Sequence, residues 1–123
     1  MKLPLEFRWL KANGFKGFVP WCLLDQPGHE GLRKEYQLET GEDFYPIARR
    51  QDCDDVAGFE VVNGEILSKV INTHLTWSGK YELEGYPIRE EYKDMFEWLM
   101  HDVIPNTWEW MSEEDLEDID VRS

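Results

Sequence analysis

The sequence predicts a single α+β domain over residues 1–123, with helices packed on one face of a predominantly antiparallel, twisted sheet. Three observations lead to this fold class: a short helical segment near the start, strand patterns joined by a tight turn in the middle, and a return to helical periodicity in the last third. A chain of 123 residues can form one packed core and is too short for two.

The first expected element is a helix over residues 5–12. Leu5, Trp9 and Ala12 share one face of this helix, and an Asn-Gly pair at 13–14 supplies a left-handed stop. We assign Trp9 on this face to the core.

An apolar strand is expected next, at residues 18–24. Pro20 restricts it to the edge of a sheet or to a bulge, because proline donates no backbone hydrogen bond. A long polar connection from 25 to 41, with a helical turn at 31–38, leads from there to the centre of the chain.

The centre of the chain is expected to form most of the sheet, with strands at 42–49, 56–62 and 65–73. Asn-Gly at 63–64 predicts a tight hairpin between the last two strands, because both central residues of a type I′ turn need positive φ. A further turn is expected at 78–79, with a short strand on either side.

Helical periodicity returns in the last third of the chain and places six apolar side chains on one wide stripe. They are Ile88, Tyr92, Met95, Phe96, Leu99 and Val103. Pro105 is expected to end or kink this helix. A last short helix is expected over 113–119, with Ser112 as its N-cap and with Leu116 and Ile119 facing inward.

Charge is the most unusual bulk property. The net charge is −13; residues 1–41 carry six Lys/Arg and five Asp/Glu, whereas residues 42–123 carry seven and twenty-one. Such a field repels nucleic acids and anionic membranes, so we expect neither as a direct ligand. It favours association with a basic protein, although acidity that serves only solubility remains an alternative.

The sequence predicts neither a membrane span nor a signal peptide. The longest apolar runs are a few residues, and the start MKLPLEFRWLK lacks the apolar core of a signal peptide. Cys22 and Cys53 are expected to be reduced thiols rather than a disulfide. We therefore expect a soluble, cytoplasmic protein.

Short motifs occur in a recognisable order along the chain. Leu-Pro at 3–4 precedes an aromatic helix that ends in Asn-Gly at 13–14, and Pro-Ile-Ala at 46–48 leads to the acidic segment 52–55. A late helix carries Tyr92, Phe96 and Leu99. Over roughly the whole chain, this order resembles the SUKH superfamily, whose domain is also described as SMI/KNR-like.

The resemblance implies a SUKH-like fold without catalytic machinery and with a binding role. Many bacterial members look like immunity proteins that neutralise polymorphic toxins, often nucleases, and fungal members act as regulatory interaction domains. Two features depart from the family pattern: Cys53-Asp54 stands where Gly-Asp is usual, and the helix that usually opens the domain before Leu-Pro is missing.

The acidic segment 52–55 does not fit a calcium loop. Counted from Asp52, the sixth and twelfth residues are Ala57 and Asn63, where such a loop needs glycine and glutamate. A loose cation site therefore remains a minor interpretation. A general acid or base is not favoured either, because no histidine or nucleophile lies nearby in sequence.

Two interpretations of this segment remain open. It is either a solvated turn, held by pairing of Asp52 and Asp54 with Arg49 or Arg50, or an acidic patch that faces a partner.

No group of residues predicts catalysis, a metal site or a cofactor. The three histidines at 29, 74 and 101 are scattered, and the cysteines lack the spacing of a zinc or redox motif. We expect no catalytic residue, no bound metal and no cofactor. A small hydrolase or metal enzyme is the least favoured hypothesis, and its mark would be a pocket lined by Asp52, Asp54 and His74.

Tryptophan is abundant, with six residues in the chain. Trp9, Trp21 and Trp98 are assigned to the core, whereas core and interface are equally supported for Trp77, Trp108 and Trp110. The acidic C-terminal segment 112–123 follows the last two. The predicted partner-binding surface comprises Asp52, Asp54, Asp55, Trp77, Tyr81, Trp108, Trp110, Glu113, Glu114 and Asp115.

The charge asymmetry and the tryptophan content predict a non-enzymatic protein-binding domain, and the resemblance to the SUKH superfamily implies an immunity protein that occupies the basic surface of a cognate toxin, often a nuclease. The alternative is a regulatory or scaffold domain with a non-toxin protein partner. Weak homo-oligomerisation is also compatible with the contrast between the slightly basic first third and the acidic remainder.

Overall fold

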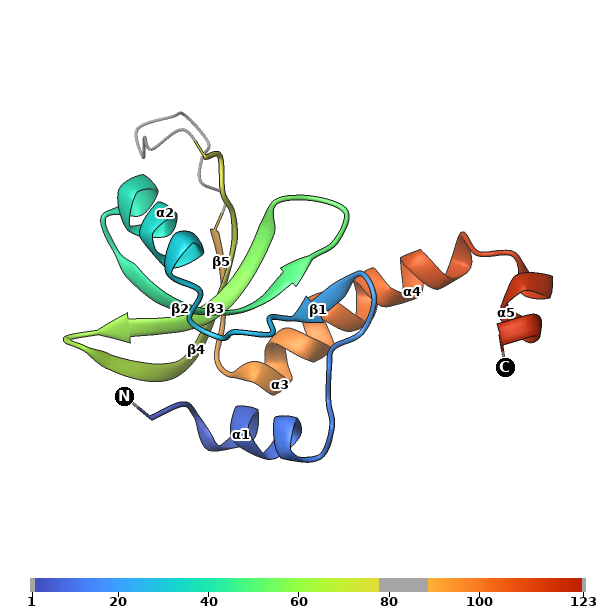
Figure 1. Cartoon of the computed structure of the whole chain (residues 1–123), viewed down its shortest axis with the longest axis horizontal. Helices are drawn as coiled ribbons and strands as arrows, with labels where there is room; N and C mark the ends of the chain where they lie inside the picture. Colours follow the sequence, from blue (N-terminus) through green and yellow to red (C-terminus); the bar gives the residue numbers. More distant parts are fainter. Residues whose placement is uncertain (1, 78–88, 123) are drawn as a thin grey trace.

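The computed structural model of the protein describes residues 2–77 and 89–122 (Figure 1). In chain order, the elements are α1 (Leu5–Ala12), β1 (Trp21–Leu23), α2 (Glu30–Thr40), β2 (Asp43–Arg50), β3 (Asp55–Val62), β4 (Glu65–His74), β5 (Arg89–Tyr92), α3 (Met95–Trp98), the π-helical turn η1 (Leu99–Val103), α4 (Ile104–Ser112) and α5 (Leu116–Arg122). The predicted turn at 78–79, Tyr81 and Ile88 lie outside the described residues.

The strands form one antiparallel sheet in the order β1-β2-β3-β4-β5, so each strand pairs with its neighbour in sequence. The predicted α+β class and antiparallel sheet are therefore confirmed. The β3–β4 hairpin turns at Asn63 and Gly64, whose φ angles of 52° and 78° are the positive values that this turn was expected to need. β1 occupies the edge position that Pro20 had suggested.

Helices cover both faces of the sheet, so the prediction that they pack on one face is wrong. Val70 and Ile71 are neighbours on β4 and therefore point to opposite faces, and each belongs to a different buried cluster. On one face, residues of α1, α3 and η1 join the core: Phe7, Met95, Trp98 and Val103. On the other face, Leu32 and Tyr36 of α2 pack against β2, β3 and β4.

The element that covers the second face is α2, which is longer than the predicted turn at 31–38. It runs for 11 residues and ends at Gly41, whose φ of 74° supplies the left-handed C-terminal cap. The sequence understates this helix because its inner face is partly polar: Glu35 and Glu39 are buried beside Leu32 and Tyr36.

The orientation of α1 is opposite to the prediction. Phe7 is the buried residue of this helix, and its ring meets that of Phe59 edge-on with 5.7 Å between centroids. Leu5 and Trp9 are instead 68% and 60% exposed, and Ala12 is exposed as well. The assignment of Trp9 to the core is therefore wrong, whereas Trp21 and Trp98 are buried as predicted.

The late helix begins seven residues after the predicted start and continues beyond Pro105. Asp94 caps it by accepting a hydrogen bond from the Glu97 N–H, and Tyr92 belongs to β5 instead. The η1 turn directly precedes α4, which contains Pro105 in its first turn and extends to Ser112. The wider π-helical turn gives the proline ring room where a regular α-helix would bring it against the carbonyl four residues earlier.

The C-terminal end of the chain projects away from the sheet (Figure 1). Neither α4 nor α5 contains a buried residue. α5 starts three residues later than expected, with Asp115 rather than Ser112 as its cap, and Leu116 is exposed instead of facing inward. Ile119 is half-buried. We call residues 104–122, which comprise α4 and α5, the arm.

Among residues 2–77 and 89–122, no helix combines the length and the apolar character needed to cross a membrane.

Candidate partner-binding surface

The predicted acidic turn between β2 and β3 is held by its own ion pairs. Arg50 donates two hydrogen bonds to Asp52, at 2.7 and 2.9 Å, and Arg49 lies 3.7 Å from Asp54. These pairs are the ones predicted from the sequence. Hydrogen bonds from Arg50 hold the pKa of Asp52 below its usual range, so this carboxylate stays charged but is neutralised locally.

The third aspartate of the turn contacts a histidine. Asp55 Oδ1 lies 2.7 Å from His74 Nδ1, and both side chains are partly exposed. Each aspartate of the turn thus has a partner within the chain, which favours the interpretation of this segment as a structured, solvated turn.

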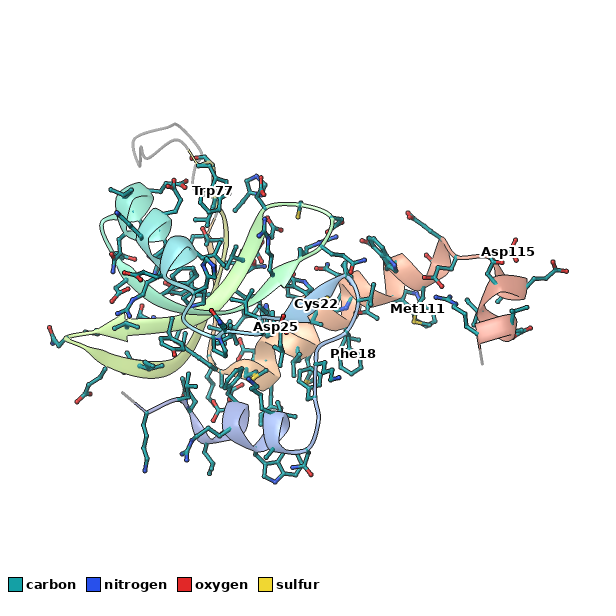
Figure 2. The ribbon with its side chains drawn as sticks, viewed as in Figure 1. Phe18, Cys22, Asp25, Trp77, Met111 and Asp115 are labelled. Atoms are coloured by element: carbon teal, nitrogen blue, oxygen red, sulfur yellow. The ribbon has the colours of Figure 1, made fainter. Side chains whose placement is uncertain are left out.

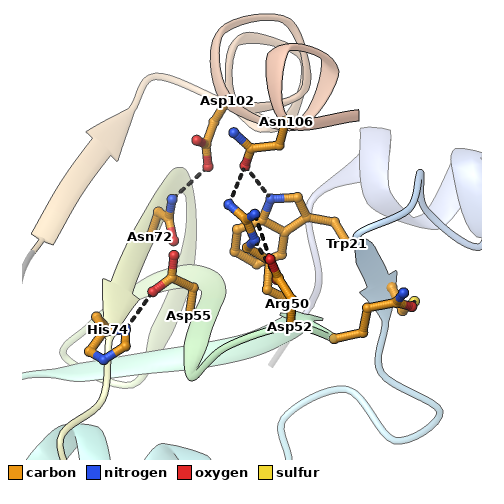
Figure 3. Close-up of polar contacts among 10 residues, drawn as sticks. Trp21, Arg50, Asp52, Asp55, Asn72, His74, Asp102 and Asn106 are labelled. Carbon is orange, nitrogen blue, oxygen red and sulfur yellow. Dashed lines mark hydrogen bonds and ion pairs between the residues drawn. The ribbon is translucent and has the colours of Figure 1, made fainter. Parts of the chain in front are cut away.

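The turn is tied to the base of the arm by a small polar network (Figure 3). Asn106 on α4 accepts hydrogen bonds through Oδ1 from Arg50 Nη1 and from Trp21 Nε1, both at 3.0 Å. The Trp21 indole is buried and packs edge-on against Trp98, with 5.3 Å between ring centroids. Asn106 therefore connects the start of the arm to the core and to the acidic turn at once.

Asp102 lies close to this network, on η1. Its Oδ2 accepts a hydrogen bond of 2.5 Å from Asn72 Nδ2 on β4. Burial, together with the nearby carboxylates of Glu90 and Asp55, raises the pKa of Asp102 to about 6. Asp102 therefore differs from Asp52, because its surroundings disfavour the charged form.

Of the three residues whose shared pocket would mark a hydrolase or metal enzyme, two line a groove in the described part of the chain. An open groove beside the turn is lined by residues 22–25 and 49–54, which include Asp52 and Asp54 but not His74. Cys22 and Cys53 both line this groove as free thiols. Within the described parts of the chain, no three His, Cys, Asp or Glu side chains are placed to hold a metal ion.

The helix from α3 to α4 is apolar on two sides, and only one of them faces the core. The outward side carries an exposed row of large apolar residues, which we call the outer stripe: Phe96, Met100, Ile104, Trp108 and Met111. Their exposed fractions run from 44% to 69%. Contiguous exposed apolar residues of this kind mark interaction sites more often than isolated ones do.

The π-helical turn keeps this stripe on one side. One i,i+4 step along a regular α-helix rotates the side chain by about 40°, so three such steps from Phe96 to Trp108 would carry the row about a third of the way around the helix. The η1 turn holds more residues per turn and reverses part of that drift between Met100 and Ile104. Helical distortions of this type are frequent at functional sites.

The arm combines this stripe with a concentration of acids. Residues 104–122 contain seven Asp/Glu and one Arg. At the elbow between α4 and α5, an open groove is lined by Glu113, Glu114, Asp115, Asp118, Val121 and Arg122, in which Arg122 pairs with Glu114. Trp108 is exposed beside this acidic elbow, and Trp110 is half-buried.

Trp77 belongs to a different part of the molecule. Figure 2 shows it beside α2 and well separated from Met111 and Asp115. Its indole is exposed, and its backbone has a φ of 58°. Buried Glu39 at the end of α2 holds this segment by accepting a hydrogen bond of 3.1 Å from the Trp77 N–H.

The predicted surface residues therefore form separate groups. Asp52, Asp54 and Asp55 lie in the turn beside the base of the arm, whereas Trp108, Trp110, Glu113, Glu114 and Asp115 lie on the arm itself. Trp77 is remote from the arm but not from the turn, because it follows Leu75 by two residues and the Leu75 N–H donates to the Asp54 carbonyl at 3.3 Å. Tyr81 is outside the described residues. Four members of the outer stripe were missed as surface residues: Phe96, Met100, Ile104 and Met111. The first three recur at i,i+4 with the predicted Trp108, a spacing that is visible in the sequence.

Comparison with protein-family models, with curated proteins and with solved structures finds no match to this chain.

Proposed function

We propose that the protein is a non-enzymatic binding domain whose arm and outer stripe dock on a basic protein. Following the resemblance to the SUKH superfamily, the partner we infer is a toxin domain of the nuclease kind, and the protein is its cytoplasmic immunity protein. No cofactor or metal takes part in this function.

The observation that carries the proposal is the exposure of the arm. This elongated helical segment carries five exposed large apolar side chains along one side, and neither α4 nor α5 contains a buried residue. The free molecule therefore gains little free energy from burial of apolar surface in α4 and α5. Burial of this side against another protein would contribute hydrophobic free energy that the free molecule lacks, at about 25 cal/mol for each Å² of apolar surface covered.

The acids determine which kind of partner fits. From residue 94 to residue 121 the chain contains ten Asp/Glu and neither Lys nor Arg. Such a segment attracts cationic surfaces and accelerates their encounter. In a nuclease, the cationic surface is the one that holds phosphates, so carboxylates on the arm would take the place of the substrate backbone, while Trp108 supplies a short-range anchor.

The alternative is a regulatory or scaffold domain that uses the same surface for a basic partner that is not a toxin. The two functions differ in the consequence of binding. An immunity protein abolishes a toxic activity of its partner, whereas a scaffold domain leaves the activity in place or redirects it.

The test is co-expression with the product of the adjacent gene, followed by titration of the two purified proteins. We expect growth to be rescued and the dissociation constant to increase with salt concentration. Trp108→Ala should weaken binding by about 30-fold, as the loss of an interface anchor does. Leu38→Ala is the matched control, because Leu38 is an exposed helical residue on α2, away from the arm.

Three results would contradict the proposal: no binding to the basic product, an affinity that does not change with salt, or equal effects of Trp108→Ala and Leu38→Ala. Binding without rescue of growth would select the scaffold alternative.

A further inference from the structure

The helix α1 presents a second exposed apolar face, and this one is basic. Leu5 and Trp9 lie one turn apart on its outer side and are 68% and 60% exposed. Arg8 lies beside them on the same helix and is exposed as well, whereas Lys11 extends over the buried Phe7 ring, 5.8 Å from its centroid. We call Leu5, Arg8 and Trp9 the α1 outer face.

This face is held outward by the core. Phe7 is buried against Phe59, and Leu10 packs against the same cluster, so α1 cannot rotate to cover Leu5 and Trp9 without exposing both. The surrounding charge is positive as well: residues 2–16 contain four Lys/Arg and a single acid, Glu6.

The α1 outer face and the outer stripe are complementary. One is a short apolar helix face with a local charge of +3 over residues 2–16, and the other is a longer apolar helix face in a segment with ten acids and neither Lys nor Arg. The eight residues of α1 span about 12 Å, so α1 can cover only part of the outer stripe, such as the part on α4, whose nine residues span about 14 Å. Two helix faces of this size can pack directly on each other.

Within one molecule, α1 and the arm lie apart. α1 lies beneath the sheet, and the arm extends beyond its side (Figure 1). A second copy of the chain can satisfy both at once, because in a two-fold arrangement each copy offers its α1 outer face to the arm of the other. Two equivalent contacts then form and the assembly closes.

We propose that the protein self-associates through packing of the α1 outer face of one copy on the outer stripe of a second copy. This inference does not depend on the proposed function, because it requires only the chain itself. Mutual repulsion between two molecules of net charge −13 opposes the pairing, so the dimer is expected to be weak and dependent on concentration.

Sedimentation velocity over a range of protein concentrations tests the proposal. We expect a monomer–dimer equilibrium in the wild type, and a dissociation constant at least about tenfold higher in both Trp9→Ala and Trp108→Ala. Leu38→Ala should leave the equilibrium unchanged. Both tryptophans are exposed, so thermal unfolding should show that all three variants remain folded.

Mixing the two tryptophan variants makes the test specific. The Trp9→Ala chain keeps an intact outer stripe, and the Trp108→Ala chain keeps an intact α1 outer face, so a mixed pair regains one of the two contacts. We therefore expect more dimer in the mixture than in either variant alone.

Different results would overturn the proposal in different ways. A wild type that stays monomeric at millimolar concentration excludes self-association. A dimer that is weakened by Trp108→Ala but not by Trp9→Ala indicates pairing of stripe with stripe. Association of the wild type with neutral or anionic lipid vesicles through Trp9, without dimers, would assign the α1 outer face to a membrane surface.

Discussion

At the scale of single residues, Glu39 is an ionisable side chain that the fold buries and satisfies with hydrogen bonds. Its side chain is fully buried, yet it accepts hydrogen bonds from the Thr76 N–H at 2.8 Å, the Thr76 hydroxyl at 2.6 Å and the Trp77 N–H at 3.1 Å. Burial alone would raise the pKa of Glu39. A side-chain hydrogen bond with Glu35 and those donated by Thr76 and Trp77 outweigh that effect and lower the pKa instead.

We predict that Glu39→Gln destabilises the protein by about 1–3 kcal/mol at pH 7, because the new amide group faces a backbone donor and leaves it unsatisfied. Because the pKa of Glu39 is lower in the folded state, its carboxylate stabilises the fold at pH values above the unfolded pKa of about 4.3. This stabilisation is lost as the pH falls through the folded-state pKa. The difference between wild type and variant in urea unfolding should therefore shrink below pH 4.

The control for this variant is Glu65→Gln, at an exposed position at the start of β4, which should change stability by less than about 0.5 kcal/mol. A stable Glu39→Gln protein at pH 7 would mean that the end of α2 does not hold residues 76 and 77 through this carboxylate.

Asp102 differs from Glu39 in that its pKa is raised rather than lowered. Its pKa is raised to about 6, so at neutral pH the folded protein carries a carboxylate where its surroundings favour the neutral acid. An unfolded aspartate ionises near pH 3.9, and stability is therefore lost as the pH rises from about 4 to 6. Asn72 can donate its hydrogen bond to an amide oxygen as well as to a carboxylate.

We predict that Asp102→Asn stabilises the protein by about 1 kcal/mol at pH 8, a value that allows for solvent screening of a partly exposed group. This gain in stability should disappear near pH 4, where residue 102 of the folded protein is uncharged in both the wild type and the variant. Asp25→Asn at an exposed position should show no comparable pH dependence. A pH-independent effect of Asp102→Asn would contradict this account of the site.

At the scale of elements, local signals predicted the parts of the fold that depend on few residues. Asn63-Gly64 determined the hairpin, and the proximity of Arg49 and Arg50 to three aspartates predicted the ion pairs of the turn. The buried face of each helix was harder to predict, because apolar residues lie on more than one side of the helix. In α1, Leu5, Phe7 and Trp9 are all apolar, and only contact with Phe59 decides which one is buried.

The candidate surface shows the same limit. Met95, Phe96, Leu99 and Met100 give the late helix two apolar sides, so periodicity alone cannot say which side meets the sheet. The acids of the arm could be found from composition, whereas the outer stripe required knowing that the helix continues through Pro105.

The acidic turn and the acidic elbow should contribute unequally to binding. The aspartates of the turn already pair with Arg49, Arg50 and His74, whereas the elbow holds an excess of acids over its single Arg122. We predict that Glu113→Gln, Glu114→Gln and Asp115→Asn together slow association with a basic partner by about tenfold at low salt.

The matching neutralisation of three charges in the turn, Asp52→Asn, Asp54→Asn and Asp55→Asn, should slow association by less than about threefold. Stopped-flow association rates at several salt concentrations would compare the two sets, which remove the same number of charges. A larger effect from the turn would move the binding site from the elbow to the β2–β3 end of the sheet.

At the scale of the whole molecule, the proposed partner binding and the proposed self-association require the same surface. The outer stripe can cover either the α1 outer face of a second copy or a basic partner, so each complex reduces the amount of the other. Both contacts combine burial of apolar surface with attraction between opposite charges. A strongly cationic partner carries more positive charge than the +3 of residues 2–16, so the acidic arm should bind the partner more tightly than a second copy.

We therefore predict that a basic partner dissociates the dimer into complexes with one copy of each protein. In sedimentation velocity, addition of partner to concentrated protein should replace the dimer boundary by that of a 1:1 complex. Trp9→Ala removes the competing contact between copies but leaves the outer stripe intact. At concentrations where the wild type is dimeric, this variant should bind the partner with an apparent affinity equal to or higher than that of the wild type. A complex that contains two copies of this chain held through Trp9 would show that the two contacts are compatible, and the partner would then have to be placed elsewhere on the arm.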